Sequence, residues 1–233
     1  KKYGADILRI WVASSNYEED LRIDYSILEQ HADSYRKIRN TFRYLLGNLN
    51  DEFQTIDTEG IDLNKLPELE QYMLHRVYDL NKKFKNYFKL YDFHNLYKEL
   101  LNFCTLDLSA FYFDIRKDVL YCDPKNSEKR KSCVILLNII LESLLKWFAP
   151  ILSFTTEEIF TLINKNKKSI HLERFIEFPK SFENKKLNEK WIELKKIRDI
   201  CNISIEAKRA SKEIGSSLEA NLIISLNEKL FKI

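Results

Sequence analysis

Four cations and no acidic residue stand in the sequence SYRKIRNTFRYLLGNL, residues 34–49. When this run is projected as a helix of 3.6 residues per turn, its apolar residues fall on one face and its arginines on another. A helix exposed to water usually pairs opposite charges three or four positions apart, at roughly 0.2–0.5 kcal/mol per pair. Asp33 and Asp51 lie outside the run, so the arginines are expected to meet an external anion. The candidate anion-binding residues are Arg36, Lys37, Arg39, Asn40 and Arg43.

The chemistry that this stripe suits is the binding of phosphate groups. A guanidinium matches phosphate oxygens with two parallel hydrogen bonds, and a helical turn of about 5.4 Å suits the spacing of a nucleic-acid backbone. Phosphate contacts of this kind attract and position RNA but carry little sequence information. The alternative is that distant acidic residues of the same chain neutralise the arginines.

A second basic cluster falls near the C-terminus, within residues 195–212. Acidic residues are interleaved there, so an ordinary solvated helix surface explains the charges as well as RNA binding does. The candidate RNA-binding residues of this cluster are Lys208, Arg209 and Lys212, and its other cations are Lys195, Lys196 and Arg198.

No group of residues predicts an active site. The four glycines cannot be assembled into a phosphate-cradling loop, and no serine elbow is present. Asp107, Asp114 and Asp118 are spaced as solvated positions of one helix, and His94 beside Asp92 is typical of a helix start. We therefore expect no catalytic residue in this sequence.

The cysteines are equally uninformative about metal chemistry. Their spacing forms no CxxC pair, and the four histidines form no HxxxH pair, so structural zinc is not expected. Buried, reduced thiols are the interpretation that fits best. The four are Cys104, Cys122, Cys133 and Cys201.

Composition predicts long helices. A content of 45% hydrophobic residues can fill a core, whereas four glycines and four prolines are too few for many turns. The apolar run at 133–148 is too short and too charged to span a membrane and reads as the central helix of a bundle. The β-branched segment 221–226 favours a strand. Helices are expected from the opening residues to about 14, from 25 to 47 or 49, and over 67–90, 93–120, 133–148, 153–163 and 187–213, the sixth with a Thr155–Glu158 capping box and the last closed by Gly215.

These elements define a mainly all-α fold: an antiparallel helical bundle with a small mixed α/β appendage at the C-terminus. The sequence is expected to divide into a connecting segment at 1–24, the bundle at 25–165 and an extension at 166–233 that carries the long basic helix. Because it opens inside a helix and without methionine, we expect it to be part of a longer protein.

Several short segments of the sequence resemble one protein family. YGADILRIWVASSNYEEDLRID and ILEQHADSYRKIRNTFRYLLGNL resemble the segment after the catalytic core of bacterial isoleucyl-tRNA synthetases, which are class Ia enzymes. FYFDIRKDVLYCD, LLKWFAPILSFTTEEIF, SIHLERF and EAKRASKEIGSSLEA resemble later blocks of the same enzymes in the same order. The resemblance covers residues 3–220 and implies the helical domain that binds the anticodon stem–loop.

The resemblance also implies which parts of such an enzyme this sequence does not contain. The HIGH and KMSKS motifs, the editing domain and the C-terminal zinc cysteines are absent from it. ATP and magnesium chemistry, and any zinc, would belong to the missing parts, so the fragment is expected to be inactive alone and to bind no cofactor. The implied partners are isoleucine tRNA and the missing catalytic and editing domains, in a monomeric, cytoplasmic protein without membrane contact.

Two other functions fit part of the pattern. The corresponding domain of valyl-tRNA synthetases shares the helical bundle, although SIHLE and GSSLEA favour the isoleucine family. A helical scaffold whose basic face docks an acidic protein would also explain the arginine stripe, and competition between tRNA and an acidic protein would separate the two.

Overall fold

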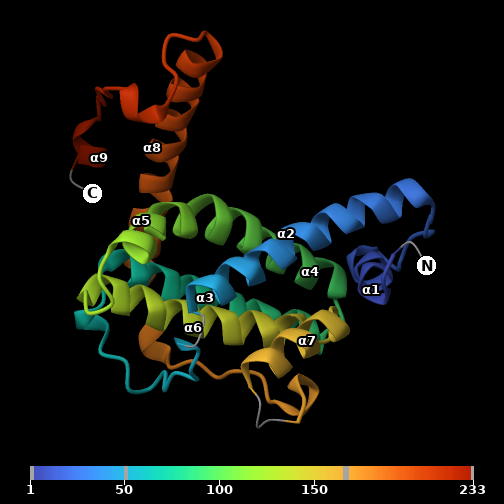
Figure 1. The fold of residues 1–233 in the computed structure, drawn as a ribbon. Coiled ribbons are helices and arrows are strands. Elements are labelled where there is room, and N and C mark those ends of the chain that lie inside the picture. The colour runs from blue at the N-terminus through green and yellow to red at the C-terminus, as the bar shows by residue number, and fades with distance from the viewer. Residues whose placement is uncertain (1–2, 50–51, 165–167, 232–233) are drawn as a thin grey trace. The chain divides into compact units, whose positions relative to one another are not determined.

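The computed structural model describes residues 3–49, 52–164 and 168–231 (Figure 1). The chain divides into two compact units, residues 1–183 and residues 184–233. The predicted boundary between residues 24 and 25 falls inside the first unit. The predicted boundary between residues 165 and 166 lies outside the described residues.

Helices build the first unit, and no strand occurs among its described residues, which confirms the predicted all-α bundle. The predicted helix positions are confirmed, and the long central helix begins five residues before its predicted start. The segment between α2 and α3, which we call the acidic loop, includes the 3-10 turn η2. The helices are α1 (Ala5–Ser14), α2 (Tyr25–Leu49), α3 (Glu68–Lys89), α4 (Phe93–Asn102), α5 (Asp114–Cys122), α6 (Glu128–Phe148) and α7 (Ser153–Ile163), with 3-10 turns η2 (Leu63–Lys65), η4 (Ile170–Leu172) and η5 (Lys180–Phe182).

The core of this unit is centred on α6, which contacts α2, α3, α5 and α7 (Figure 1). Trp147 is fully buried, and its indole N–H donates to Asn81 Oδ1 at 3.0 Å, so the polar atom of this large ring is satisfied. Phe148 of α6 meets Phe42 of α2 edge to face, with ring centroids 6.1 Å apart. These contacts fix one face of α2 against the bundle.

The helix predicted over 93–120 is continuous but changes its winding. Between α4 and α5 the chain forms a π-helix, η3 (Phe103–Phe113). Because π-helical hydrogen bonds join residues five apart, each residue turns less far around the axis than in an α-helix. The three successive aromatic residues 111–113 are consequently all buried, as expected for core side chains.

The long helix 93–122 lies beside α2 and runs in the same direction. Tyr97 near its start meets Ser34, whereas Tyr121 near its end meets Asn48, whose Nδ2 lies 3.5 Å from the tyrosine hydroxyl. By contrast, α3 and α4 are joined by a short turn and run antiparallel. Contact between α2 and the helix 93–122 is thus concentrated on the π-helical part, with Tyr121 reaching the C-terminal end of α2.

A side chain of α1 caps the start of α7. The buried carboxylate of Asp6 accepts the backbone N–H of Thr155 at 2.8 Å and its hydroxyl at 2.6 Å. Arg9 adds a bond from its Nε to the carbonyl of Ile151 at 2.8 Å. The predicted capping box of Thr155 and Glu158 is wrong, because Thr155 lies inside α7 and a carboxylate from another helix satisfies its N–H.

The second unit consists of α8 (Lys185–Ala210), the 3-10 turn η6 (Ser217–Glu219) and the short helix α9 (Glu228–Phe231). α8 ends three residues before its predicted end at Glu213. Lys212 takes the left-handed conformation, with a φ of 60°, and the N–H of Glu213 bonds to the carbonyl of Lys208 at 3.0 Å. This closure comes before Gly215, so the predicted glycine stop is wrong.

The predicted α/β appendage is not observed. Residues 221–226 form no strand in the described part of the chain. A strand needs a neighbouring strand to accept and donate its backbone hydrogen bonds, and the described residues provide none. β-branched composition alone was therefore not sufficient for the prediction.

Candidate nucleic-acid interface

The apolar face of α2 is buried as predicted. Ile38, Phe42, Leu45 and Leu49 are each at most 1% exposed. These residues repeat at the spacing of one helix face, so their burial fixes which side of α2 points to solvent.

The opposite side of α2 carries the predicted cations. We call Arg36, Arg39, Asn40 and Arg43 the cationic stripe, and all four residues are exposed. Within the described residues, Arg39, Arg43 and the exposed Lys37 form no ion pair with the protein. Their charges are therefore not neutralised by ion pairs within the described residues, and the binding of an external anion stays a prediction.

Arg36 differs from this expectation, because it forms an ion pair with Asp33 one turn earlier. The prediction that the run has no local acidic partner is wrong for this residue. Both side chains are more than half exposed, however, and such surface pairs contribute only about 0–1 kcal/mol. A phosphate could replace Asp33 at little cost.

Aromatic packing holds the C-terminal end of α2. The ring of Tyr44 stacks on Phe113 of the π-helix at 4.1 Å between centroids, and burial raises the pKa of Tyr44 well above its usual value. Tyr44 also meets Tyr121 of α5 edge to face. The sequence gave no signal for this cluster, because its residues come from segments about 70 positions apart.

The second predicted cluster, in the other unit, is largely neutralised. Lys208 pairs with Glu213, and Arg209 pairs with Glu206 at 2.6 Å. Lys212 is exposed and has no ion pair among the described residues. Local acids therefore neutralise two of the three cations, as expected for an ordinary solvated helix surface. RNA binding there stays a prediction.

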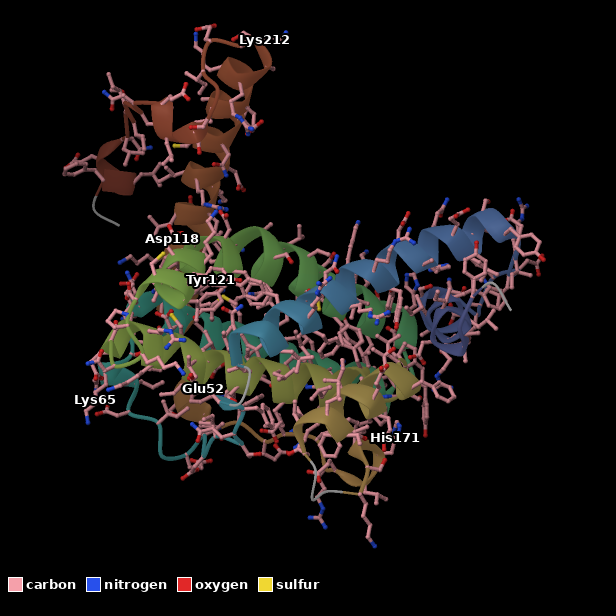
Figure 2. The ribbon with its side chains drawn as sticks, in the orientation of Figure 1. Glu52, Lys65, Asp118, Tyr121, His171 and Lys212 are labelled. Carbon is pink, nitrogen blue, oxygen red and sulfur yellow. The ribbon has the colours of Figure 1, made fainter. Side chains whose placement is uncertain are left out.

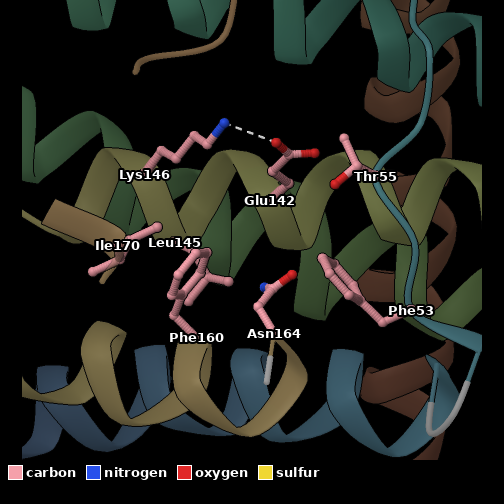
Figure 3. Close-up of a pocket in the computed structure, with 8 residues that line it drawn as sticks. All are labelled: Phe53, Thr55, Glu142, Leu145, Lys146, Phe160, Asn164 and Ile170. Carbon is pink, nitrogen blue, oxygen red and sulfur yellow. Dashed lines mark hydrogen bonds and ion pairs between the residues drawn. The ribbon is translucent and has the colours of Figure 1, made fainter. Parts of the chain in front are cut away.

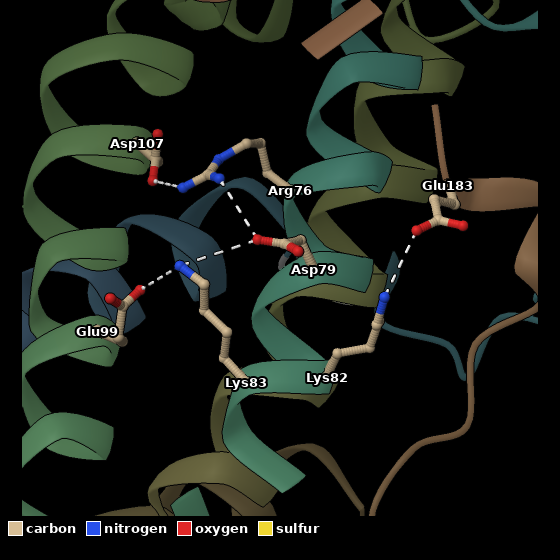
Figure 4. Close-up of polar contacts among 7 residues, drawn as sticks. All are labelled: Arg76, Asp79, Lys82, Lys83, Glu99, Asp107 and Glu183. Carbon is tan, nitrogen blue, oxygen red and sulfur yellow. Dashed lines mark hydrogen bonds and ion pairs between the residues drawn. The ribbon is translucent and has the colours of Figure 1, made fainter. Parts of the chain in front are cut away.

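Two of the acids considered for catalysis have structural roles. Asp107 is buried, not solvated as expected, and accepts a hydrogen bond from Arg76 at 3.0 Å (Figure 4). Asp92 caps α4 as its position suggested, by accepting the N–H of Asn95. The His94 ring bonds to a backbone carbonyl of α1. The contacts of Asp107 and His94 thus join different helices.

A small cavity lies between α6, α7 and the acidic loop (Figure 3). Its volume is about 10 Å³, which is room for no more than a single water molecule. Glu142 and Lys146 form an ion pair at 2.8 Å across its lining. The cavity is too small for a substrate. Its lining residues are Phe53, Thr55, Glu142, Leu145, Lys146, Phe160, Asn164 and Ile170.

The cysteines fit the prediction only in part. Cys104 and Cys133 are buried, and burial raises the pKa of each to about 12, whereas Cys122 is exposed and Cys201 half-buried. No three His, Cys, Asp or Glu side chains are grouped to hold a metal ion in the described part of the chain. No helix among the described residues is both long and apolar enough to cross a membrane.

The described residues of the first unit thus define a helical domain with an exposed cationic stripe on α2. The family model for the anticodon-binding domain of tRNA ligase matches residues 70–224. That match covers about two thirds of the chain, and the chain belongs to this family. The match begins after α2, so it does not itself include the cationic stripe.

The curated relatives extend the similarity to the whole chain. The isoleucine–tRNA ligase of Pelagibacter ubique is 82% identical over 233 residues, which are 100% of this chain and 26% of that protein. The isoleucine–tRNA ligases of Mesorhizobium japonicum and Bartonella henselae are 41% and 40% identical over 98% and 100% of this chain, and 23% and 24% of their own lengths. The chain thus spans about a quarter of the length of these relatives.

Proposed function

We propose that residues 1–233 are the tRNA-binding part of an isoleucine–tRNA ligase and that the cationic stripe contacts the phosphates of the anticodon stem–loop. The observation that carries the proposal is the exposed side of α2, where Arg39 and Arg43 have no ion pair among the described residues. The family membership and the 82% identity to an isoleucine–tRNA ligase support tRNA as the anion.

The ligation itself is assigned to other parts of the polypeptide. We propose that the full protein joins isoleucine to tRNA with ATP and magnesium, as a cytoplasmic monomer, and that catalytic and editing domains outside residues 1–233 carry this chemistry. Residues 1–233 alone should then give no isoleucine-dependent exchange of pyrophosphate into ATP. Exchange above a blank without protein, in a preparation free of host ligase, would contradict this assignment.

A binding titration tests the stripe directly. Arg39→Gln with Arg43→Gln should weaken binding of isoleucine tRNA and flatten the plot of log K against log salt by roughly 0.7–0.9 per lost phosphate contact. Helicity should be unchanged, because both side chains avoid the buried face of α2. The matched control is Lys89→Gln with Lys129→Gln, which removes the same charge from exposed positions on α3 and α6.

The outcome is decided by comparing the two double variants at one salt concentration. If the arginine variant keeps its helicity and binds as tightly as the control, the stripe does not contact RNA. Because phosphate contacts carry little sequence information, residues 1–233 should prefer isoleucine tRNA over other tRNAs by less than about tenfold. A hundredfold preference would show that base-reading residues dominate the binding.

A further inference from the structure

The cationic stripe continues into a glycine that the fold does not require. Arg36, Asn40, Arg43 and Gly47 follow one another at spacings of four, three and four residues, so Gly47 is the next position on the same side of α2. Apart from the adjoining backbone of α2, no atom of the described residues lies within 4 Å of the place where a Cβ would stand, and the φ of Gly47 is not positive. Glycine inside a helix is destabilising relative to alanine. A ligand that passes close to the helix backbone would explain a glycine at this position, because a side chain would block its approach.

An exposed aromatic ring stands beside this glycine. Tyr121 of α5 is 67% exposed (Figure 2). Its hydroxyl lies 3.5 Å from Nδ2 of Asn48, and Tyr44 meets it edge to face at 6.5 Å between centroids. Because Tyr44, Gly47 and Asn48 are three and four residues apart, they share one side of α2. Gly47 therefore lies on the side of the helix that meets Tyr121.

The charges around these residues differ between the two helices. Arg43 stands one turn before Gly47 on α2, whereas Asp118 stands one turn before Tyr121 on α5 and is exposed. On α5, Lys117 is also one turn before Tyr121 but pairs with Asp114, so this side has no free positive charge and phosphates are attracted to the α2 side. A nucleobase carries no net charge, and its flat face can stack on an aromatic ring. The α5 side thus suits a base, and the α2 side suits the backbone that carries it.

We propose that Tyr121 is a stacking platform for one unpaired nucleobase of the tRNA anticodon loop, whose backbone passes over Gly47. This inference rests on the proposed function and adds to it a base-contacting position. The base must be unpaired, because a paired base is already stacked within its own helix. The rigid support of the platform is the stack of Tyr44 on Phe113, with centroids 4.1 Å apart.

Abasic substitution tests the stacking contact. The probe is a hairpin RNA with the sequence of the isoleucine anticodon stem–loop, in which each loop base in turn is replaced by an abasic site. Tyr121→Leu should weaken binding of the intact hairpin by roughly 5- to 150-fold, whereas Tyr121→Phe should bind like the parent. One abasic site should weaken binding to the parent and leave binding to Tyr121→Leu unchanged.

The matched control for this variant is Tyr25→Leu, which removes a tyrosine that is 74% exposed at the other end of α2. It should bind every hairpin like the parent. If Tyr121→Leu also binds like the parent, or if every abasic site weakens it as much as the parent, the stacking proposal is overturned. The Arg39→Gln, Arg43→Gln variant separates this failure from failure of the proposed function, because it should lose affinity in either case.

Gly47 supplies a second test, in which stability should rise while affinity for RNA falls. Gly47→Ala meets no side chain of the described residues and improves helix propensity, so the melting temperature should rise by about 2–4 °C. Gly47→Met should also fold, since methionine is a good helix former. Both variants should bind the hairpin more weakly than the parent, and methionine should weaken it more. Unchanged affinity in Gly47→Met would overturn the close approach of the RNA backbone.

Discussion

A buried ion pair joins α3 to α5 across the core of the first unit. The side chain of Glu70 is fully buried, and that of Arg116 is 8% exposed. The guanidinium donates from Nε and from one terminal nitrogen to the two carboxylate oxygens, each at 2.7 Å. Tyr112 and Cys133 donate to the same carboxylate at 3.0 and 3.4 Å. Although burial lowers the pKa of Arg116, its hydrogen bonds to Glu70 raise it above the usual value, so the guanidinium stays charged.

Glu70→Gln should strongly destabilise the protein. The amide keeps the size of the carboxylate but removes its charge and turns one acceptor into a donor that faces the guanidinium. Breaking a buried pair by removing one partner costs about 3–5 kcal/mol, because the other charge stays buried without compensation. Glutamine retains one acceptor, so we expect about 3 kcal/mol. For a chain of this length, that loss lowers the melting temperature by about 6–12 °C.

The assay is urea unfolding followed by circular dichroism. The matched variant replaces the whole cluster, as Glu70→Leu with Arg116→Met and Tyr112→Phe, so that no charge or buried hydroxyl is left without a partner. Replacing a complete buried pair with apolar residues is often neutral. This triple variant should therefore be more stable than Glu70→Gln alone. A Glu70→Gln protein within about 0.5 kcal/mol of the parent, or a triple variant less stable than the single one, would refute the reasoning.

Three further predictions concern the backbone at one tyrosine, the titration of two histidines and the reactivity of two cysteines. Tyr91 has a φ of 58°, a conformation that costs a residue with a side chain about 1–2 kcal/mol. Tyr91→Gly removes this cost but gives the unfolded chain more freedom, so urea unfolding should show a net rise in unfolding free energy of about 0.5–1 kcal/mol. Burial lowers the pKa of His31 and of His75, so below about pH 6.5 the unfolded chain binds more protons than the folded one. The unfolding free energy should therefore be highest above that pH and fall towards about pH 5.5. Equal unfolding free energies at about pH 7.5 and about pH 5.5 would contradict this. Burial raises the pKa of Cys133 to about 12 while Cys122 is exposed, so mass spectrometry should find a thiol reagent on Cys122 and none on Cys133 of the folded protein.

The features that were predictable from the sequence are those determined by local spacing. The amphipathic period of residues 34–49 placed both the buried face and the cationic stripe of α2, since a helix sets the angle between successive side chains. The error at Arg36 was also local. Asp33 stands three residues earlier, at a spacing where side chains meet on a helix, and it had been counted as outside the run.

The features that were not predictable depend on contacts between distant segments. Asp6 caps a helix that begins about 150 positions later, and Arg76 pairs with Asp107 from a neighbouring helix. A sequence shows that each residue is charged but not which buried group it meets. The π-helical winding of residues 103–113 has no signature in hydrophobic period, because most residues there are apolar, including the whole run 110–113, and such a segment shows no clear period.

The cationic stripe and Tyr121 should make different kinds of contact with RNA, one with phosphates and one with a base. Phosphates repeat along every RNA, so the cationic stripe contributes an affinity that salt weakens and that changes little with sequence. A stacking platform at Tyr121 accepts a base only where the RNA leaves one unpaired, so it selects a loop over a helix. Substitutions in the stripe should consequently weaken all RNAs together, whereas Tyr121→Leu should weaken the hairpin and leave binding of a fully paired duplex unchanged. Gly47 lies only four residues beyond Arg43, a rise of about 6 Å along α2, so the backbone that carries the stacked base passes directly beyond the last arginine.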